Sequence, residues 1–254
     1  MKLLKNTEKK EDKAEMPFLD HLEELRWCVI KSVLSVLIIT VISFFFSKYL
    51  FDILMIPGNR LDPPLKVQAI NVQTPFMILL EIAFIMGIVL SLPVIFYQIW
   101  KFVSPGLLRN EKTVVPALAL STLLCFSLGA VFAYFVIIPN ALYFFRKLAG
   151  TIDYNISLDS YLSFILRLIL VFGVIFLLPI LSFILTKIGI LTPKYMRKYR
   201  RYAIVLSFIL GAILTPPDVI TQILLAVPLV VLYEFSIFIS YFFSRKKKKN
   251  TPQT

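Results

Sequence analysis

Six long apolar runs constrain the fold of this chain more than any other feature of its sequence. They cover residues 28–50, 75–100, 114–138, 161–186, 202–214 and 219–243. A helix needs about 20 apolar residues to cross the roughly 30 Å hydrocarbon core of a bilayer. Because lipid offers no hydrogen bonds, each run must pair its own backbone amides, and a helix does so. The sequence therefore predicts an all-α, polytopic membrane protein with six transmembrane helices.

Composition supports the same class of protein. Apolar residues make up 58% of the 254-residue chain and charged residues only 17%, whereas a soluble domain is about 45–50% apolar and about 25% charged. This excludes an ordinary soluble enzyme, a disordered chain and a disulfide scaffold. Cys28 and Cys125 lie in apolar runs and are interpreted as small buried hydrophobic residues. The net charge of +12 favours a role at a membrane surface over nucleic-acid binding.

The basic residues are divided unequally between the two sides of the predicted membrane. Twenty lie before the first run, after the second and fourth runs, or after the last one, and only four lie in the alternate loops. Loops rich in Lys and Arg stay in the cytoplasm. Both termini are therefore predicted to be cytoplasmic, with charged tails at residues 1–17 and 244–254. The loops predicted to face outside are 51–74, 139–160 and 215–218.

Prolines and one short run add detail to this prediction. Pro93, Pro179 and Pro228 lie inside runs, where each removes a backbone donor and is expected to bend its helix. The run 202–214 has thirteen residues, which make a helix of only about 20 Å. The sequence TPPD at 215–218 then turns the chain at once. We therefore expect a short hairpin with the last run, beside which the bilayer is thinned.

No pattern in the sequence indicates catalysis. His21 is the only histidine, and a zinc motif of the H-E-x-x-H kind needs two histidines one helical turn apart. The chain also lacks a glycine-rich phosphate loop, a Ser–His pairing and paired aspartates within its apolar runs. The sequence therefore predicts a protein that is not an enzyme and that holds no metal or cofactor.

Acidic residues are the more informative set. Glu81 and Glu234 lie within apolar runs, and an ionisable group at membrane depth is a candidate functional residue. The alternative is that each reaches interfacial water or pairs with a neighbour. Asp20, Glu23 and Glu24 cluster before the first run. They are interpreted either as a site for a cationic ligand or as first-turn residues that stabilise a helix N-terminus.

Five motifs, in order along the chain, resemble those of the TatC family, the multispanning subunit of the twin-arginine protein translocase. They are FLDHLEELR at 18–26, PVIFYQIWKFVSPGL at 93–107 with Glu111 after it, FAYF at 132–135, SYLSF at 160–164, and LTPPD at 214–218. The resemblance runs from residue 18 to residue 243, which makes this stretch a six-span membrane domain.

The resemblance implies a concave, glove-like arrangement of six helices, the last two short, in a cell membrane. It implies a core receptor that binds twin-arginine signal peptides on the cytoplasmic face. Single-span partners, TatA-like and TatB-like, are then recruited, and folded cargo proteins cross the membrane on the protonmotive force. Self-association and contact with lipid are expected, and nucleic-acid binding is not.

The resemblance also assigns candidate roles to particular residues. The signal-peptide site would comprise Glu24, Arg26, Phe102, Pro105, Leu107 and Glu111. The contact with a partner helix would comprise Gln222, Leu225 and Glu234. Structural or outer-loop positions would be Pro57, Pro216, Pro217 and Asp218.

Two departures from the family pattern stand out. Trp27 and Cys28 occupy the place where many members have a second basic residue after the first arginine. Leu177 stands where many members have a polar residue in the fourth span, so Gln222 or Glu234 would supply the polar contact alone. Two other functional classes stay open on the residues alone. A secondary transporter or channel would use the midspan prolines and intramembrane glutamates, and an intramembrane enzyme would need a catalytic constellation.

Overall fold

A computed structural model describes residues 4–103, 115–150, 155–214 and 219–249. Helices dominate these residues, as predicted. The first half holds α1 (Leu4–Asn59), α2 (Thr74–Val103), α3 (Val115–Phe132), a π-helical turn η3 (Ala133–Ile137) and α4 (Ile138–Ala149). The second half holds α5 (Leu158–Ile175), α6 (Leu178–Ile188), the short α7 (Pro193–Lys198), α8 (Arg200–Leu214) and α9 (Val219–Lys249).

The predicted all-α, polytopic fold is confirmed. Within the described residues, five helical stretches are long and apolar enough to cross a membrane: Leu22–Asn59, Thr74–Ile99, Leu120–Ala149, Leu158–Lys187 and Val219–Phe242. The sixth helix is α8, whose 15 residues make about 22 Å. The expected hairpin is present, because α8 packs against α9. Only its first helix is short, since α9 has 31 residues.

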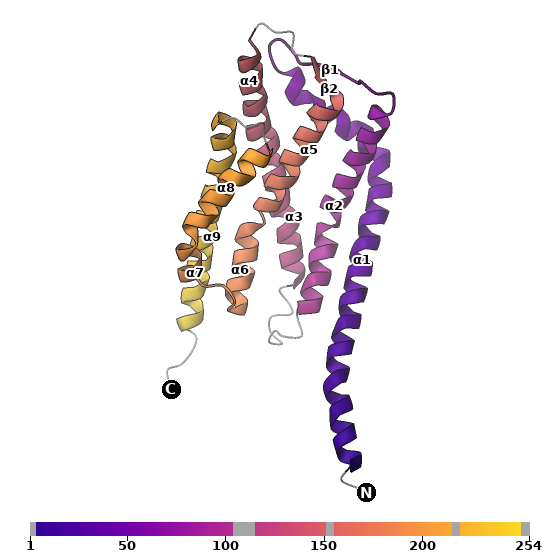
Figure 1. The fold of residues 1–254 in the computed structure, drawn as a ribbon, viewed down its shortest axis with the longest axis vertical. Coiled ribbons are helices and arrows are strands. Elements are labelled where there is room, and N and C mark those ends of the chain that lie inside the picture. The colour runs from indigo at the N-terminus through magenta and orange to yellow at the C-terminus, as the bar shows by residue number, and fades with distance from the viewer. Residues whose placement is uncertain (1–3, 104–114, 151–154, 215–218, 250–254) are drawn as a thin grey trace.

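Neighbouring helices form one continuous layered bundle. α1 packs along α2, α2 along α3, and α3 along α5, while α9 packs against both α6 and α8. Figure 1 shows that α1 begins and α9 ends at the same end of the bundle, opposite the strands. We call the end that carries the strands the strand end, and the other the terminal end.

Two outer connections differ from prediction because helices extend into them. Residues 51–59 were expected in a loop, but α1 continues to Asn59. The loop predicted to begin at Pro139 is also wrong, since α4 runs on to Ala149. The π-turn η3 widens the helix just before Pro139, which accommodates a residue that cannot donate a helical hydrogen bond.

What remains of these connections is tied together by a small sheet. Strand β1 (Lys66–Gln68) pairs in parallel with β2 (Asn155–Ser157), with Val67 opposite Ile156. The sequence did not predict this pair. It fixes the connection between α1 and α2 against the start of α5.

The three midspan prolines behave differently from one another. The fourth span is interrupted at Phe176 and Leu177, two residues before Pro179, which agrees with the expected disturbance of this helix. Pro93 and Pro228 instead lie inside helices α2 and α9, which remain continuous.

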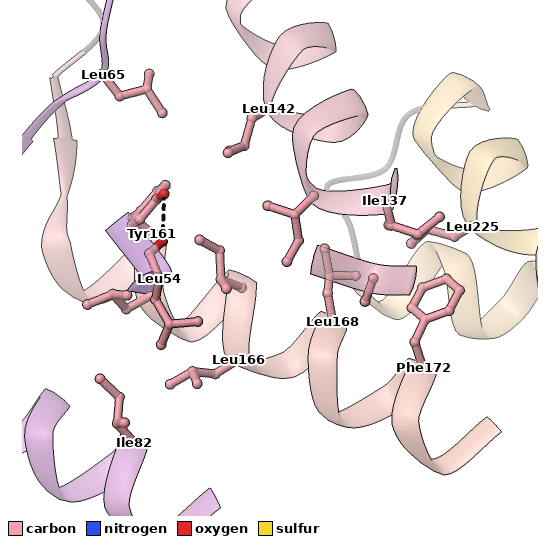
Figure 2. Close-up of a cluster of buried hydrophobic side chains, with 14 of the residues drawn as sticks. Leu54, Leu65, Ile82, Ile137, Leu142, Tyr161, Leu166, Leu168, Phe172 and Leu225 are labelled. Carbon is pink, nitrogen blue, oxygen red and sulfur yellow. Dashed lines mark hydrogen bonds between the residues drawn. The ribbon is translucent and has the colours of Figure 1, made fainter. Parts of the chain in front are cut away.

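The core is centred on α5. Leu162, Ile165, Leu168 and Phe172 are fully buried on one face of this helix. They pack against buried residues of α1, α2, η3, α4 and α9, as Figure 2 shows. Leu177 belongs to a second, smaller cluster with Leu92 and Phe126.

Candidate functional site

The acidic residues of the first motif lie in the middle of a helix. α1 begins at Leu4 and has no acidic residue in its first turn. The interpretation of Asp20, Glu23 and Glu24 as first-turn residues of a helix is therefore wrong. Glu24 and Arg26 are both exposed on α1. Residues two apart on a helix do not face one another, so Arg26 lies on a different side of α1 from Glu24.

A contact between α1 and α2 puts Glu24 and Phe102 at the same level of the bundle. The thiol of Cys28 donates to the backbone carbonyl of Gln98 over 3.5 Å. α1 and α2 are antiparallel (Figure 1). One turn from Cys28 toward the terminal end of the bundle is Glu24, and one turn from Gln98 in the same direction is the half-buried Phe102. Helix geometry therefore puts these two predicted site residues at the same level.

The other members of the predicted signal-peptide site are Pro105, Leu107 and Glu111. They fall in residues 104–114, outside the described residues, as do Pro216, Pro217 and Asp218.

Gln222 lies one turn into α9 and joins it to α8. Its side-chain Nε2 donates to the carbonyl of Phe208 over 3.0 Å. The two helices are close here, since a methyl group added at Gly211 would lie 3.1 Å from the carbonyl oxygen of Gln222. Gln222 is half-buried, whereas Ile223 beside it is 44% exposed.

Leu225 does not lie on the surface. Its side chain is completely buried in the core with Ile137 and Phe172 (Figure 2). A contact between this side chain and a partner helix would require the core to open. Our expectation for Leu225 is corrected accordingly, because the residue packs within its own chain.

Glu234 is paired within the chain. Arg200, the first residue of α8, donates from Nε and Nη2 to both carboxylate oxygens of Glu234 on α9. The two residues line a pocket of about 420 Å³ together with Arg197, Phe238 and Tyr241. Of the two interpretations of Glu234, the structure supports pairing with a neighbour.

Glu81 is also engaged. Ser163 on α5 donates to its carboxylate over 3.4 Å, and the glutamate is half-buried on α2.

Pro57 lies in α1 and not in an outer loop. It is buried near the end of the helix and lacks the N–H that would normally bond the carbonyl of Ile53. The hydroxyl of Tyr134 donates to that carbonyl over 2.7 Å. The next pair of backbone groups is also bonded by a tyrosine. The hydroxyl of Tyr161 accepts from the Gly58 N–H over 2.9 Å and donates to the Leu54 carbonyl over 3.1 Å.

Sequence reasoning missed these two tyrosines. Both occur in the motifs FAYF and SYLSF, but a tyrosine in an apolar run gives no signal of its hydrogen-bond partner. Within the described residues, no group of three or more His, Cys, Asp or Glu side chains is placed to hold a metal ion.

The comparisons with known proteins agree with this architecture. The family model for the Sec-independent protein translocase protein TatC matches residues 20–228. The TatC protein of Aquifex aeolicus is 41% identical over 237 residues, covering 92% of this chain and 98% of its own length. The Escherichia coli K12 TatC protein is 35% identical over 232 residues, covering 91% of this chain and 90% of its own.

A solved crystal structure has the same fold. It is that of a twin-arginine translocase receptor, TatC, and it superimposes with a TM-score of 0.79 at 41% sequence identity. The superposition covers 87% of this chain and 98% of the crystallised one.

Proposed function

The chain belongs to the TatC family of Sec-independent protein translocase proteins, and we propose that it is the receptor subunit that binds twin-arginine signal peptides. As a family member it is a multi-pass membrane component of a protein translocase and not an enzyme. The proposal adds the ligand, the binding residues and the partners.

The observation that carries the proposal is the placement of Glu24. Its exposed carboxylate lies level with the aromatic ring of Phe102, at the end of the bundle where α1 begins and α9 ends. We assign this end to the cytoplasm, because twenty basic residues lie on that side and four on the other. A signal peptide presented from the cytoplasm reaches this end first.

The chemistry of the site favours arginine over lysine. A guanidinium presents a planar fork of donors that matches both oxygens of a carboxylate, whereas an ammonium is a compact point charge. In the proposal, Glu24 takes one guanidinium of the signal peptide and Glu111 takes the other. Phe102, Pro105 and Leu107 line the path of the peptide beside them. Arg26 lies on another side of α1 from Glu24 and is not part of this pairing.

Peptide binding to the full chain in nanodiscs tests this assignment. A charged hydrogen bond contributes about 1.5–3 kcal/mol, so Glu24→Gln and Glu111→Gln are each expected to weaken binding of a twin-arginine peptide about ten- to hundredfold. A peptide with two lysines in place of the arginines should bind the parent protein as weakly.

Glu23→Gln is the matched control. Glu23 is also exposed and is adjacent, but it lies about 100° around the helix from Glu24, so its substitution is expected to leave binding unchanged. Equal affinity of the parent and both test variants would move the peptide site away from these glutamates.

We propose that TatA-like and TatB-like single-span helices dock on the outer part of the α8–α9 hairpin. α8 is too short to span the hydrocarbon alone, so a neighbouring helix would cover its exposed flank. One amide N–H of Gln222 donates to Phe208, and the proposal assigns the rest of this amide to a polar residue of the partner.

Crosslinking in native membranes tests this docking surface. A cysteine at Ile223, which is exposed beside Gln222, is expected to capture a partner helix. A cysteine at Leu225 is expected not to, since that side chain is buried. Capture at other surface positions but never at Ile223 would place the partner elsewhere. Transport of folded cargo by the protonmotive force completes the proposed function.

A further inference from the structure

Arg167 is a charged residue in an unusual place. It lies on α5, nine residues after the helix begins at Leu158, which is about 13 Å along the helix axis. The stretch Leu158–Lys187 is one of the membrane-crossing segments. Its 30 residues make about 45 Å of helix against roughly 30 Å of hydrocarbon, so Arg167 lies in the outer part of the hydrocarbon. A guanidinium at such a depth is expensive unless it meets an acceptor.

The described residues provide no direct acceptor for the Arg167 side chain. Among the described residues, Arg167 has no hydrogen bond or ion pair, and it is exposed on the surface of the bundle. Arg200, the first residue of α8, differs in this respect, because Glu234 accepts from its Nε and Nη2.

Glu81 and Ser163 make the surroundings of Arg167 polar. α2 and α5 both begin at the strand end and lie side by side (Figure 1). Ser163 bonds Glu81 across this contact, and Arg167 lies one turn after Ser163 on the same face of α5. Because Cα–Cβ bonds tilt toward the start of a helix, the side chain of Arg167 leans back toward the level of these two residues.

We propose that Arg167, with Ser163 one turn away and Glu81 beside them, forms an intramembrane docking site for a transmembrane helix that carries a carboxylate. Arg167 supplies the cation that the partner's carboxylate neutralises, and the planar guanidinium binds both carboxylate oxygens. Leu170 and Val174 continue the face of α5 below Arg167, and Val174 is 49% exposed. The apolar part of the partner helix can pack on these two residues. Charge complementarity therefore commits the site to an acidic single-span helix.

The Arg167 site would be a second docking surface for a partner helix. That the partner is a single-span helix follows from the proposed function. It lies on α2 and α5, whereas Gln222 and Ile223 lie on α9. A partner helix can thus meet the receptor at two surfaces that recognise different groups, an amide at one and a guanidinium at the other.

Designed transmembrane peptides test the site without knowledge of the native partner. Each peptide has an apolar Leu–Ala segment of about 20 residues. Glu, Gln or Ala occupies a position about nine residues from its outer end, to match the depth of Arg167. Binding to the full chain in nanodiscs is followed by energy transfer between labels. The Glu peptide is expected to bind the parent protein about tenfold more tightly than the Ala peptide, which corresponds to about 1.4 kcal/mol.

Three variants should change binding of the Glu peptide in different directions. Arg167→Leu should abolish the preference for the Glu peptide, and it removes a charge from the membrane, so insertion of the protein should not suffer. Glu81→Gln should strengthen binding of the Glu peptide by a few-fold, because it removes a like charge beside the site. Lys48→Leu is the matched control, since Lys48 is an exposed cation inside the first span, and it should change nothing.

Two results would overturn the proposal. One is equal binding of the Glu and Ala peptides by the parent protein, and the other is a preference that survives Arg167→Leu. Titration of the same samples with a twin-arginine peptide tests the signal-peptide site separately from the Arg167 site. Arg167→Leu should bind that peptide as the parent does, whatever the outcome with the transmembrane peptides.

Discussion

The hydroxyl of Tyr161 is expected to be a major contributor to the stability of the bundle. The side chain is 2% exposed, and its oxygen accepts from the Gly58 N–H and donates to the Leu54 carbonyl. It thus links the end of α1 to α5. Tyr161→Phe removes one oxygen atom and with it the hydrogen bonds to two backbone groups of α1.

The magnitude follows from those two groups. Each buried backbone group left without a hydrogen bond costs about 1–3 kcal/mol. Because the groups are adjacent and can partly bond one another after relaxation, we expect Tyr161→Phe to lower the free energy of unfolding by about 2–4 kcal/mol. Tyr134→Phe removes the hydrogen bond to only one backbone group, the Ile53 carbonyl. It should lower the free energy of unfolding by about 1–2 kcal/mol.

The assay is reversible unfolding of the full chain in bicelles, compared between variants. Tyr143→Phe is the matched control, because Tyr143 is 63% exposed on α4, and its effect should be within about 0.5 kcal/mol of zero. The expected order of destabilisation is Tyr161→Phe, then Tyr134→Phe, then Tyr143→Phe. If Tyr161→Phe and Tyr143→Phe unfold alike, the tyrosine does not hold the end of α1.

A double-mutant cycle separates hydrogen bonding from packing. A methyl group added at Gly58 would lie 2.7 Å from the Tyr161 oxygen, so Gly58→Ala should be destabilising in the parent protein. In the Tyr161→Phe background the oxygen is absent, and the effect of Gly58→Ala should be smaller. Additive effects would indicate that the two residues act independently.

Three further predictions concern topology and packing. A cysteine at the exposed Asn71 should be labelled from outside the cell and one at the exposed Thr192 only from inside; outside labelling of Thr192 would refute the six-span arrangement. Gly129→Ala should lower the free energy of unfolding by about 1–3 kcal/mol in the same bicelle assay, because the added methyl group would lie 2.6 Å from the carbonyl oxygen of Phe172. Leu177→Gln should also destabilise the protein in that assay, because the Leu177 side chain is 5% exposed among apolar neighbours. An amide buried there would have no hydrogen-bond partner. Stability equal to that of the parent would mean that this cluster opens to water.

The spans could be predicted from the sequence because the membrane imposes a simple rule. Length and hydropathy decide whether a segment crosses, and neither depends on how helices pair. The ends of the spans are determined by tertiary packing. Residues 51–59 and 139–149 remain helical because they pack against the bundle, so the termini of α1 and α4 depend on tertiary contacts. The same is true of β1 and β2, whose three-residue strands exist only as a pair.

Proline shows the same division between local and tertiary control. Each midspan proline removes one hydrogen bond in any context, and this much is readable from the sequence. Whether the helix then breaks depends on the surroundings: the chain breaks before Pro179 but continues through Pro93 and Pro228. At Pro57 the freed carbonyl finds a tyrosine from a different part of the chain. Only the folded structure brings that donor to it.

Charges within the spans show why site residues are harder to predict than spans. Glu81, Arg167 and Glu234 all appear in the sequence as ionisable groups in apolar surroundings, and each alone qualifies as a functional candidate. The fold distinguishes them through their neighbours. Glu234 is neutralised by Arg200, so its charge stabilises the α8–α9 contact and is already satisfied within the chain. Arg167 has no such counterpart among the described residues, which is why we propose that another helix brings a carboxylate to it.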